Sequence, residues 1–359
     1  MSVVAKHLSP PFRGRLHGAA RAVLAFGLTV GAAVGLLGLS ASSRAAAAAS
    51  LTVLMGDDSA AHSEFVQQLR ASQEPGGRFE LVRLSPTGEM PQTIETAGAE
   101  PEPRANAGVR TRSMRPSSDA GLTMAVGAAA ARAAVERPGQ EPLVLAMLSR
   151  LDYEALKAGS PALKRGDRRV GVLLRDPAMA DQLALIGAVL PQKHRIGVVA
   201  TPESEPLVRE LQRAAQGANP AWDVRVEYAP DARSLAAALR TVVPQSDALM
   251  VLPDLIGDNQ AATLSVLRAG AGAGLPVFGA SEGLVRSGGL AAAVSTPSQL
   301  AQQARLLGQK VAAAAGSHSG PLVEAATPAT VRVNATVARG LGLRLPEERE
   351  LTDRLAATR

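Results

Sequence analysis

The 359-residue sequence contains no cysteine, and this absence excludes several kinds of site at once. Without a thiol the chain can form no disulfide bond, no thiolate metal site and no cysteine nucleophile. Lipid attachment at an N-terminal cysteine is excluded for the same reason. The chemistry of any functional site must therefore come from other side chains or from the backbone.

Aromatic residues and histidines are also scarce, and aromatic residues make up only 2% of the chain. A stacking box for an aromatic ligand is therefore hard to assemble. The histidines show no pair at the spacing of helical metal ligands, and no G-x-S-x-G elbow, phosphate loop or dinucleotide fingerprint occurs in a strand-turn-helix setting. We therefore expect no enzyme, no metal and no cofactor. Beyond residue 50 the aromatic residues and histidines are Phe65, Phe79, Tyr153, Trp222, Tyr228, Phe278, His62, His194 and His318.

The first 49 residues have the order of parts that is typical of a secretory signal peptide. Basic residues between Lys6 and Arg21 precede an apolar stretch at residues 22–41, and an alanine string follows at residues 45–49. We predict a cleaved signal peptide at residues 1–49, with the cut near 47–49, and a periplasmic protein of a Gram-negative cell. The alternative is a retained anchor, because the apolar stretch approaches the roughly 20 residues that span a bilayer. The glycines and the alanine string favour cleavage.

Cleavage of the predicted signal peptide would lower the net charge of the chain. The whole chain has a formal charge of +6, and residues 1–50 hold five basic side chains and no acidic one, so the remainder carries +1. A basic face for nucleic acid is not expected on so nearly neutral a chain. Roughly 310 residues remain, which is too long for one ordinary core and suits two domains.

From residue 51 onward, short apolar runs alternate with alanine- and leucine-rich stretches of helical period, which is typical of β-α-β units and parallel sheets. Residues 85–118 are polar and rich in proline, arginine and glycine, and predict a loop or partly disordered segment. Residues 153–166 are interpreted as a connecting region. Strands are predicted at residues 51–55, 79–84, 122–126, 143–148, 170–174, 195–200, 223–228, 248–252, 276–279, 289–294 and 330–334. Helices are predicted from Ser59 onward and at residues 128–135, 179–190, 205–216, 232–242, 259–273, 297–315 and from 346.

Four segments of the second half resemble one known family in their order and spacing. They are KHRIGVVATPESEP at 193–206, DALMVLPD at 247–254, GLPVFGASEGLVRSGGLAAAVS at 274–295 and NATVARGLGLRLP at 334–346. The chain is similar to the ABC transporter substrate-binding proteins with the type I periplasmic binding protein fold, and in particular to those of the tryptophan and tyrosine type. In the first half only residues 122–131 are recognisable.

The resemblance implies an α/β fold of two parallel-sheet, Rossmann-like lobes joined by a three-segment hinge, with a small ligand between them. We assign residues 51–168 and 286–316 to the N-terminal lobe, and residues 169–285 and 317–359 to the C-terminal lobe. In open parallel sheets ligands gather beyond the carboxyl ends of the strands, where helix N-termini present free N–H groups. The candidate ligand-binding residues at those ends are Asp57, Asp58, Ser59, Gly127, Ala128, Ser149, Thr201, Ser204, Asp254, Ser281 and Glu282.

The chain both keeps and departs from the family pattern. The pairs at 278–279 and 282–283 match it, whereas Ala128 replaces a hydroxyl residue and the run PDLI at 253–256 replaces Pro-Thr-Asp-Asn. These departures remove side chains that could bind an α-amino acid, although N–H groups at the Gly127 turn could still hold a carboxylate.

Each candidate also has a structural interpretation. The Gly127 turn suits a tight strand-to-helix connection as well as a ligand-facing one. Asp57 and Asp58 suit the positive end of a helix better than a metal or acid-base pair. Glu282 is either a solvated loop carboxylate or a cleft acceptor for an ammonium or hydroxyl group.

The sequence thus predicts a monomeric periplasmic binder that captures a small, amino-acid-like solute and delivers it to an inner-membrane ABC permease. The alternative is a periplasmic sensor or accessory protein that has a degenerate ligand site and signals to a membrane partner. The apolar residues Ala128, Leu255 and Ile256 favour this alternative, because each stands where the family has a polar side chain.

Overall fold

The structure is a computed structural model that describes residues 50–73, 77–84, 94–97, 121–166, 168–314 and 320–358. The predicted signal peptide and most of the segment at 85–118 lie outside the described residues. No helix within the described ranges combines the length and the apolar character that crossing a bilayer requires.

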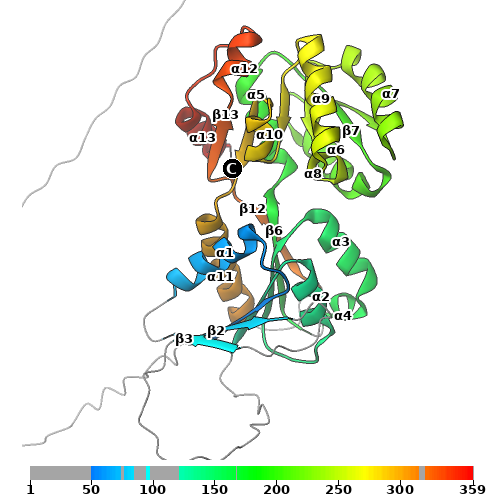
Figure 1. Ribbon diagram of the computed structural model, residues 1–359. Coiled ribbons are helices and arrows are strands. Elements are labelled where there is room, and N and C mark those ends of the chain that lie inside the picture. Colours follow the sequence, from blue (N-terminus) through cyan, green and yellow to red (C-terminus); the bar gives the residue numbers. More distant parts are fainter. Residues whose placement is uncertain are drawn as a thin grey trace, which may run out of the picture. The chain divides into compact units, whose positions relative to one another are not determined.

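The first sheet has the order β12-β6-β5-β4-β1-β2-β3 among the described residues, and β3 alone runs antiparallel to its neighbour (Figure 1). Its inner strands are nearly continuous apolar runs, as expected where helices cover both faces of a parallel sheet. The strands are β1 Leu51–Met55, β2 Phe79–Arg83, β3 Ile94–Ala97, β4 Leu122–Val126, β5 Leu143–Leu148, β6 Val170–Pro177 and β12 Leu322–Ala326.

Two helical layers cover the first sheet, one on each face (Figure 1). On one face Phe65 and Leu69 of α1 (Ala60–Ala71) share a buried core with Leu307 of α11 (Pro297–Ala313). On the other face pack α2 (Ala128–Glu136), α3 (Arg150–Gly159) and α4 (Pro161–Arg165).

The second sheet has the order β13-β11-β10-β9-β7-β8, again parallel except for the edge strand β13. Its strands are β7 Arg195–Ala200, β8 Asp223–Tyr228, β9 Ala248–Val251, β10 Val277–Gly279, β11 Ala291–Val294 and β13 Thr330–Val333. The helices of this lobe are α5 Met179–Val189, α6 Glu205–Gly217, α7 Ala232–Val242, α8 Leu255–Asp258, α9 Gln260–Ala273, α10 Glu282–Arg286, α12 Ala335–Gly340 and α13 Glu348–Ala357, with 3-10 turns at Pro202–Ser204 and Val243–Gln245.

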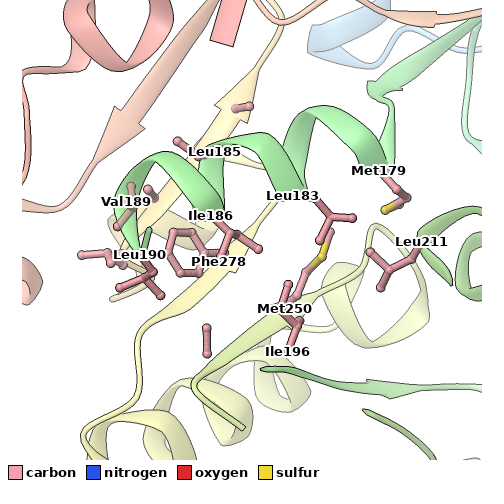
Figure 2. Packing of buried hydrophobic residues seen from close by; sticks show 14 of the residues in the cluster. Met179, Leu183, Leu185, Ile186, Val189, Leu190, Ile196, Leu211, Met250 and Phe278 are labelled. Carbon is pink, nitrogen blue, oxygen red and sulfur yellow. The ribbon is translucent and has the colours of Figure 1, made fainter. Parts of the chain in front are cut away.

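The larger core of the second lobe lies between its sheet and the layer that contains α5, α6 and α13. Figure 2 shows Leu183 and Ile186 of α5 directed toward Met250 of β9 and Phe278 of β10. Helices α7 and α9 enclose a second core on the opposite face of the sheet.

The chain passes between the two lobes three times, which confirms the predicted fold class. It leaves the first sheet after β6 to form α5, returns after β11 to form α11, and crosses again between β12 and β13. The segments that join the lobes are therefore residue 178, residues 295–296 and residues 327–329.

The strand pairing places the boundaries between the two lobes at other residues than those predicted from the sequence. β6 pairs with β5 and β12 in the first sheet, although residues from 169 onward were assigned to the second lobe. β11 pairs with β10 in the second sheet, although the first lobe was expected to resume at 286. β12 lies in the first sheet, within the range 317–359 assigned to the second lobe. An apolar run predicts a strand but not its pairing partner, so these limits could not be taken from the pattern.

Several parts of the secondary structure also differ from the prediction; the short helices α8, α10 and α12 were not predicted, and three further differences have clear causes. β3 lies inside the segment that was predicted to be a loop, and it is a four-residue edge strand without an apolar run. The connecting region at 153–166 is helical, because Ser149 starts α3 with a capping box and Pro161 starts α4. β12 was not predicted, since its sequence LVEAA suits helix and strand equally.

Gly171 in β6 allows α11 to pack closely against the first sheet. A Cβ atom built at this position lies 2.8 Å from Val311 Cγ2 and 2.9 Å from Leu307 Cγ. Both neighbours belong to α11, so this helix rests on the glycine itself.

We expect Gly171→Ala to lower the free energy of unfolding by about 1–3 kcal/mol, because the added methyl group overpacks this contact. Chemical denaturation of the purified protein measures the change. Gly272→Ala in α9 is the matched control, since a Cβ there meets no atom within 4 Å, and it should be neutral or stabilise by up to about 1 kcal/mol. Equal stability of the two variants would contradict the packing of α11 on β6.

Candidate functional site

The residues after β1 form a local hydrogen-bonded cluster at the start of α1. The Ser59 hydroxyl accepts the His62 N–H at 3.4 Å, and Asp57 Oδ1 accepts the Ser59 N–H at 3.1 Å. Burial acts to raise the pKa of Asp57, but the hydrogen bonds from Ser59 and His62 outweigh it and lower that pKa. The ionised Asp57 thus accepts a hydrogen bond from His62 Nδ1 at 2.7 Å. Asp58 is exposed and lies 3.8 Å from Arg83 Nη1.

Gly127 makes room for the ring of His62 at the start of α2. Its φ of 83° lies in the left-handed region, and a Cβ there would stand 2.6 Å from His62 Cε1. The Gly127 N–H donates to Ala146 O at 2.9 Å, so it serves the sheet. Ala128 follows as the first residue of α2, which has no side-chain cap. His62 was not among the candidate residues, and only its five-residue spacing from Asp57 hints at this contact.

Ser149 after β5 is buried and forms a capping box at the start of α3. Its hydroxyl donates to Asp152 Oδ2 at 2.6 Å and accepts the Asp152 N–H at 3.0 Å. The Ser149 hydroxyl therefore forms its hydrogen bonds within the start of α3.

A polar link between the lobes follows directly at Arg150. The Arg150 Nε donates to Glu210 Oε2 on α6 at 2.9 Å. The other oxygen of Glu210 accepts the N–H of Met179 at 3.2 Å, the first residue of α5. One carboxylate of the second lobe thus binds both α3 and the segment that leaves β6.

Thr201, Ser204 and Asp254 come together in the second lobe, as expected for residues that end neighbouring strands. All three are buried. The Ser204 hydroxyl contacts Thr201 Oγ1 at 2.9 Å and donates to Asp254 Oδ2, whose partner oxygen Oδ1 accepts the N–H groups of Ile256 and Gly257. Burial raises the pKa of Asp254 and these hydrogen bonds oppose the rise. The cluster connects the ends of β7 and β9 through side chains that form hydrogen bonds with one another.

Ser281 and Glu282 follow β10 but face different neighbours. The Ser281 hydroxyl accepts the Leu284 N–H at 3.1 Å and so starts α10. Glu282 Oε1 lies 3.1 Å from Arg332 Nε of β13, an ion pair without hydrogen-bond alignment, and its Oε2 lies 3.4 Å from Arg286 Nη1. Ser281 borders the cavity described next, whereas Glu282 does not.

A cavity of about 450 Å³ lies where the carboxyl end of β6 meets the carboxyl ends of β9 and β10. From the first sheet, Arg175 and Asp176 line it. From the second lobe, Leu252 and Pro253 line it after β9, and Ser281 after β10. The other lining residues also belong to the second lobe and include Gln260, Leu264, Gly283 and Leu284.

A larger hollow of about 590 Å³ lies between α2, α3 and α4 and includes Ala128. Its lining comes from the first lobe alone. The smaller cavity is the better candidate site, because it combines both lobes with the edge of a parallel sheet at which ligands gather.

Asp176 is the unusual group of this cavity. Its side chain is 19% exposed, and Oδ2 is buried without a hydrogen-bond partner. The nearest cation is Arg175, whose Nε lies 3.6 Å from Oδ2. Burial raises the pKa of Asp176 to about 6; Arg175 opposes the rise, and the carboxylates Asp258 and Asp152 add to it.

The structure thus places the predicted residues in separate clusters, and most of their polar groups already have partners within the fold. Arg175 and Asp176 were missed, because the predicted strand ended at 174. A signal was present: two charged residues directly follow a buried strand and precede Pro177, which is where parallel strands present ligand contacts.

Comparison with known proteins identifies the family and agrees with the fold. The sequence profile of a family described as ABC transporter substrate binding protein matches residues 118–352. A search of curated proteins found no match.

Solved structures share the fold at low sequence identity. The ligand-free, open structure of CD0873, a substrate-binding protein with adhesive properties from Clostridium difficile, aligns with a TM-score of 0.58 and 16% identity over 83% of this chain and 96% of that one. A conserved domain protein from Vibrio cholerae aligns with a TM-score of 0.51 and 19% identity over 86% and 98% of the two chains. An ABC domain bound to L-Trp, from Streptococcus pneumonia, gives 0.49 and 15% over 83% and 96%.

The buried carboxyl of Asp176 makes stability depend on pH in a defined direction. Because the folded-state pKa of Asp176, about 6, lies above its ordinary value of 3.8, this residue favours folding below pH 4 and loses that contribution as pH rises through 6. We expect Asp176→Asn to raise the free energy of unfolding at pH 7.5, by roughly 1–3 kcal/mol. The gain should shrink as pH falls toward 4.5.

Urea unfolding of both proteins at a series of pH values measures this difference. Asp353→Asn, at an exposed position of α13, is the control and should follow the parent protein at every pH. A constant difference between Asp176→Asn and the parent across the series would show that the buried carboxyl is not the cause.

Proposed function

Because the chain belongs to the ABC transporter substrate-binding protein family, we propose that it captures a small, amino-acid-like solute between its lobes in the periplasm and delivers it to an inner-membrane ABC permease. Proteins of this family and fold bind substrates and are not enzymes. The solute, the compartment and the permease are the parts of this proposal that go beyond family membership.

The cavity at the junction of β6, β9 and β10 is the observation that carries the proposal. Its volume of about 450 Å³ suits a molecule of amino-acid size. The lining includes charged groups (Arg175, Asp176), a hydroxyl (Ser281) and apolar side chains (Leu252, Leu264). Such a set can hold a small polar solute in one orientation while burying its apolar part.

The N-terminal sequence supports the periplasmic location. Basic residues, an apolar stretch and an alanine string precede the first strand, in the order of a signal that directs export and is then removed. The permease follows from the role of the family, since a periplasmic binder delivers its solute to a membrane transporter.

Export gives a direct test. When the whole sequence is expressed in a Gram-negative host, we expect the protein in the periplasmic fraction, with an intact mass that corresponds to cleavage near residues 47–49. A protein that keeps residues 1–49 and sediments with membranes would contradict the proposed location.

A thermal-shift screen of the exported protein tests solute capture, because a ligand that binds only the folded state raises its stability. The panel consists of amino acids, small peptides, amines and small anions. We expect at least one compound of amino-acid size to raise the melting temperature in a concentration-dependent way. If no compound of the panel raises the melting temperature, that result would contradict capture of a small solute and favour the sensor or accessory role.

A cavity-filling variant locates the site of any compound that binds. A Cβ at Gly283 meets only Ser281 Oγ, at 3.8 Å, so Gly283→Leu should fold and project its side chain into the cavity. We expect at least tenfold weaker binding by calorimetry. Gly272→Leu, at a position open to solvent on α9, should bind like the parent protein. Unchanged binding by Gly283→Leu would place the site elsewhere.

A further inference from the structure

The end of the cavity beside β6, where the chain crosses between the lobes, is called its hinge end. It holds a carboxyl group with an oxygen that accepts no hydrogen bond from the protein. Asp176 Oδ2 is buried and has no hydrogen-bond partner, and the side chain lines the cavity. A buried carboxylate that lacks donors destabilises a protein. This one differs from Asp57, Asp152 and Asp254, whose carboxylates all accept backbone hydrogen bonds at the starts of helices.

The charges around Asp176 leave the hinge end of the cavity negative. The groups that face it are Arg175 on its own strand, Asp258 on α8 and Asp152 on α3. Arg175 lies between two carboxylates, with Nε 3.6 Å from Asp176 and Nη2 3.7 Å from Asp258. Both distances exceed those of charge-assisted hydrogen bonds. Asp176 and Asp258 thus share one guanidinium group, and Asp152 adds a further negative charge that acts on Asp176.

The rest of the lining combines aliphatic walls with uncharged polar side chains such as Gln260, Thr263 and Ser281. Leu252, Leu264 and Leu284 provide apolar walls, and no aromatic ring occurs among the described residues that line the cavity. An aliphatic chain can be buried there, while the charge that needs compensation stands at one end.

We propose that Asp176 binds the ammonium group of a small aliphatic solute at the hinge end of this cavity. The inference rests on the proposed function and names the chemical class of the solute. An ammonium group supplies the donors that Asp176 Oδ2 lacks and offsets the excess negative charge. Neutral alcohols and anions of the same skeleton bring no positive charge, so they should be rejected.

The test uses compounds that share a skeleton and differ in charge. Isopentylamine, isopentanol and isovalerate form the matched set, and L-leucine, L-lysine and 1,4-diaminobutane extend the ammonium class. Each is added to the exported full-length gene product in a thermal-shift assay at pH 7.5, and calorimetry gives the affinity of each compound that raises the melting temperature.

Asp176→Asn is the diagnostic variant, because it preserves size and removes the charge, and Asp353→Asn is its control. We expect only ammonium compounds to bind the parent protein and the control, with at least tenfold weaker binding by Asp176→Asn. We also expect the parent's affinity to fall as pH drops from 7.5 to 5, since Asp176 becomes protonated, and Asp176→Asn to lack this dependence. Circular dichroism confirms that the variant is folded.

Two results overturn the inference and can be told apart. Binding of a compound without a cationic group, or equal binding of an ammonium compound by Asp176→Asn, refutes the role of Asp176 and leaves solute capture intact. Failure of the parent protein to bind any compound of this panel or of the wider screen refutes the proposed function, and the inference with it.

Discussion

The passage of the chain out of β6 brings strand ends of both lobes to one place, where they line the candidate site. Met179 begins α5 two residues after β6 ends, and its N–H donates to Glu210 Oε1. The same carboxylate accepts from Arg150 of the first lobe. Because groups on both sides of this crossing bind one side chain, the carboxyl end of β6 is held beside those of β9 and β10. The cavity at this junction follows from chain topology and not from a sequence motif.

Most polar side chains at the ends of strands are used by the fold itself. In β-α-β units a hydroxyl or carboxylate after a strand also precedes a helix, where it accepts the free N–H groups of the first turn. Ser59, Ser149 and Ser281 all do this. β6 differs from these, because α5 starts from Ala178 without a side-chain cap, as α2 does from Gly127. Asp176 caps no helix N-terminus, and the protein tolerates the cost of a buried carboxyl whose Oδ2 accepts no hydrogen bond. Such costs are commonly found where a protein binds its ligand.

The sequence predicted the regular elements well and their relationships less well. Strands such as Leu122–Val126 and Arg195–Ala200 were predicted at their observed bounds, because a continuous apolar run between helical stretches has little alternative to a buried parallel strand. The sequence did not predict to which sheet β6, β11 and β12 belong, because strand pairing is decided by contacts between residues that are distant in the sequence. The same limit applies to the candidate site. Thr201 lies near Asp254 because their strands are neighbours in the sheet. The hydrogen bonds that connect both residues to Ser204 depend on side-chain geometry, which the spacing of residues in the sequence does not reveal.

The polar link between the lobes bears on the proposed capture of a solute. The Arg150–Glu210 pair is partly exposed, at 22% and 18% of its side chains, and ion pairs in such settings contribute on the order of 1 kcal/mol. A solute present at a hundred times its dissociation constant stabilises the bound state by about 2.7 kcal/mol. A solute that contacts Asp176 on one side and second-lobe groups on the other therefore outweighs the polar link in holding the lobes together. The charge that destabilises the ligand-free protein is also the charge that a cationic group neutralises. On the proposal that Asp176 binds an ammonium group, solute recognition and the apposition of the lobes are linked through one side chain at the crossing.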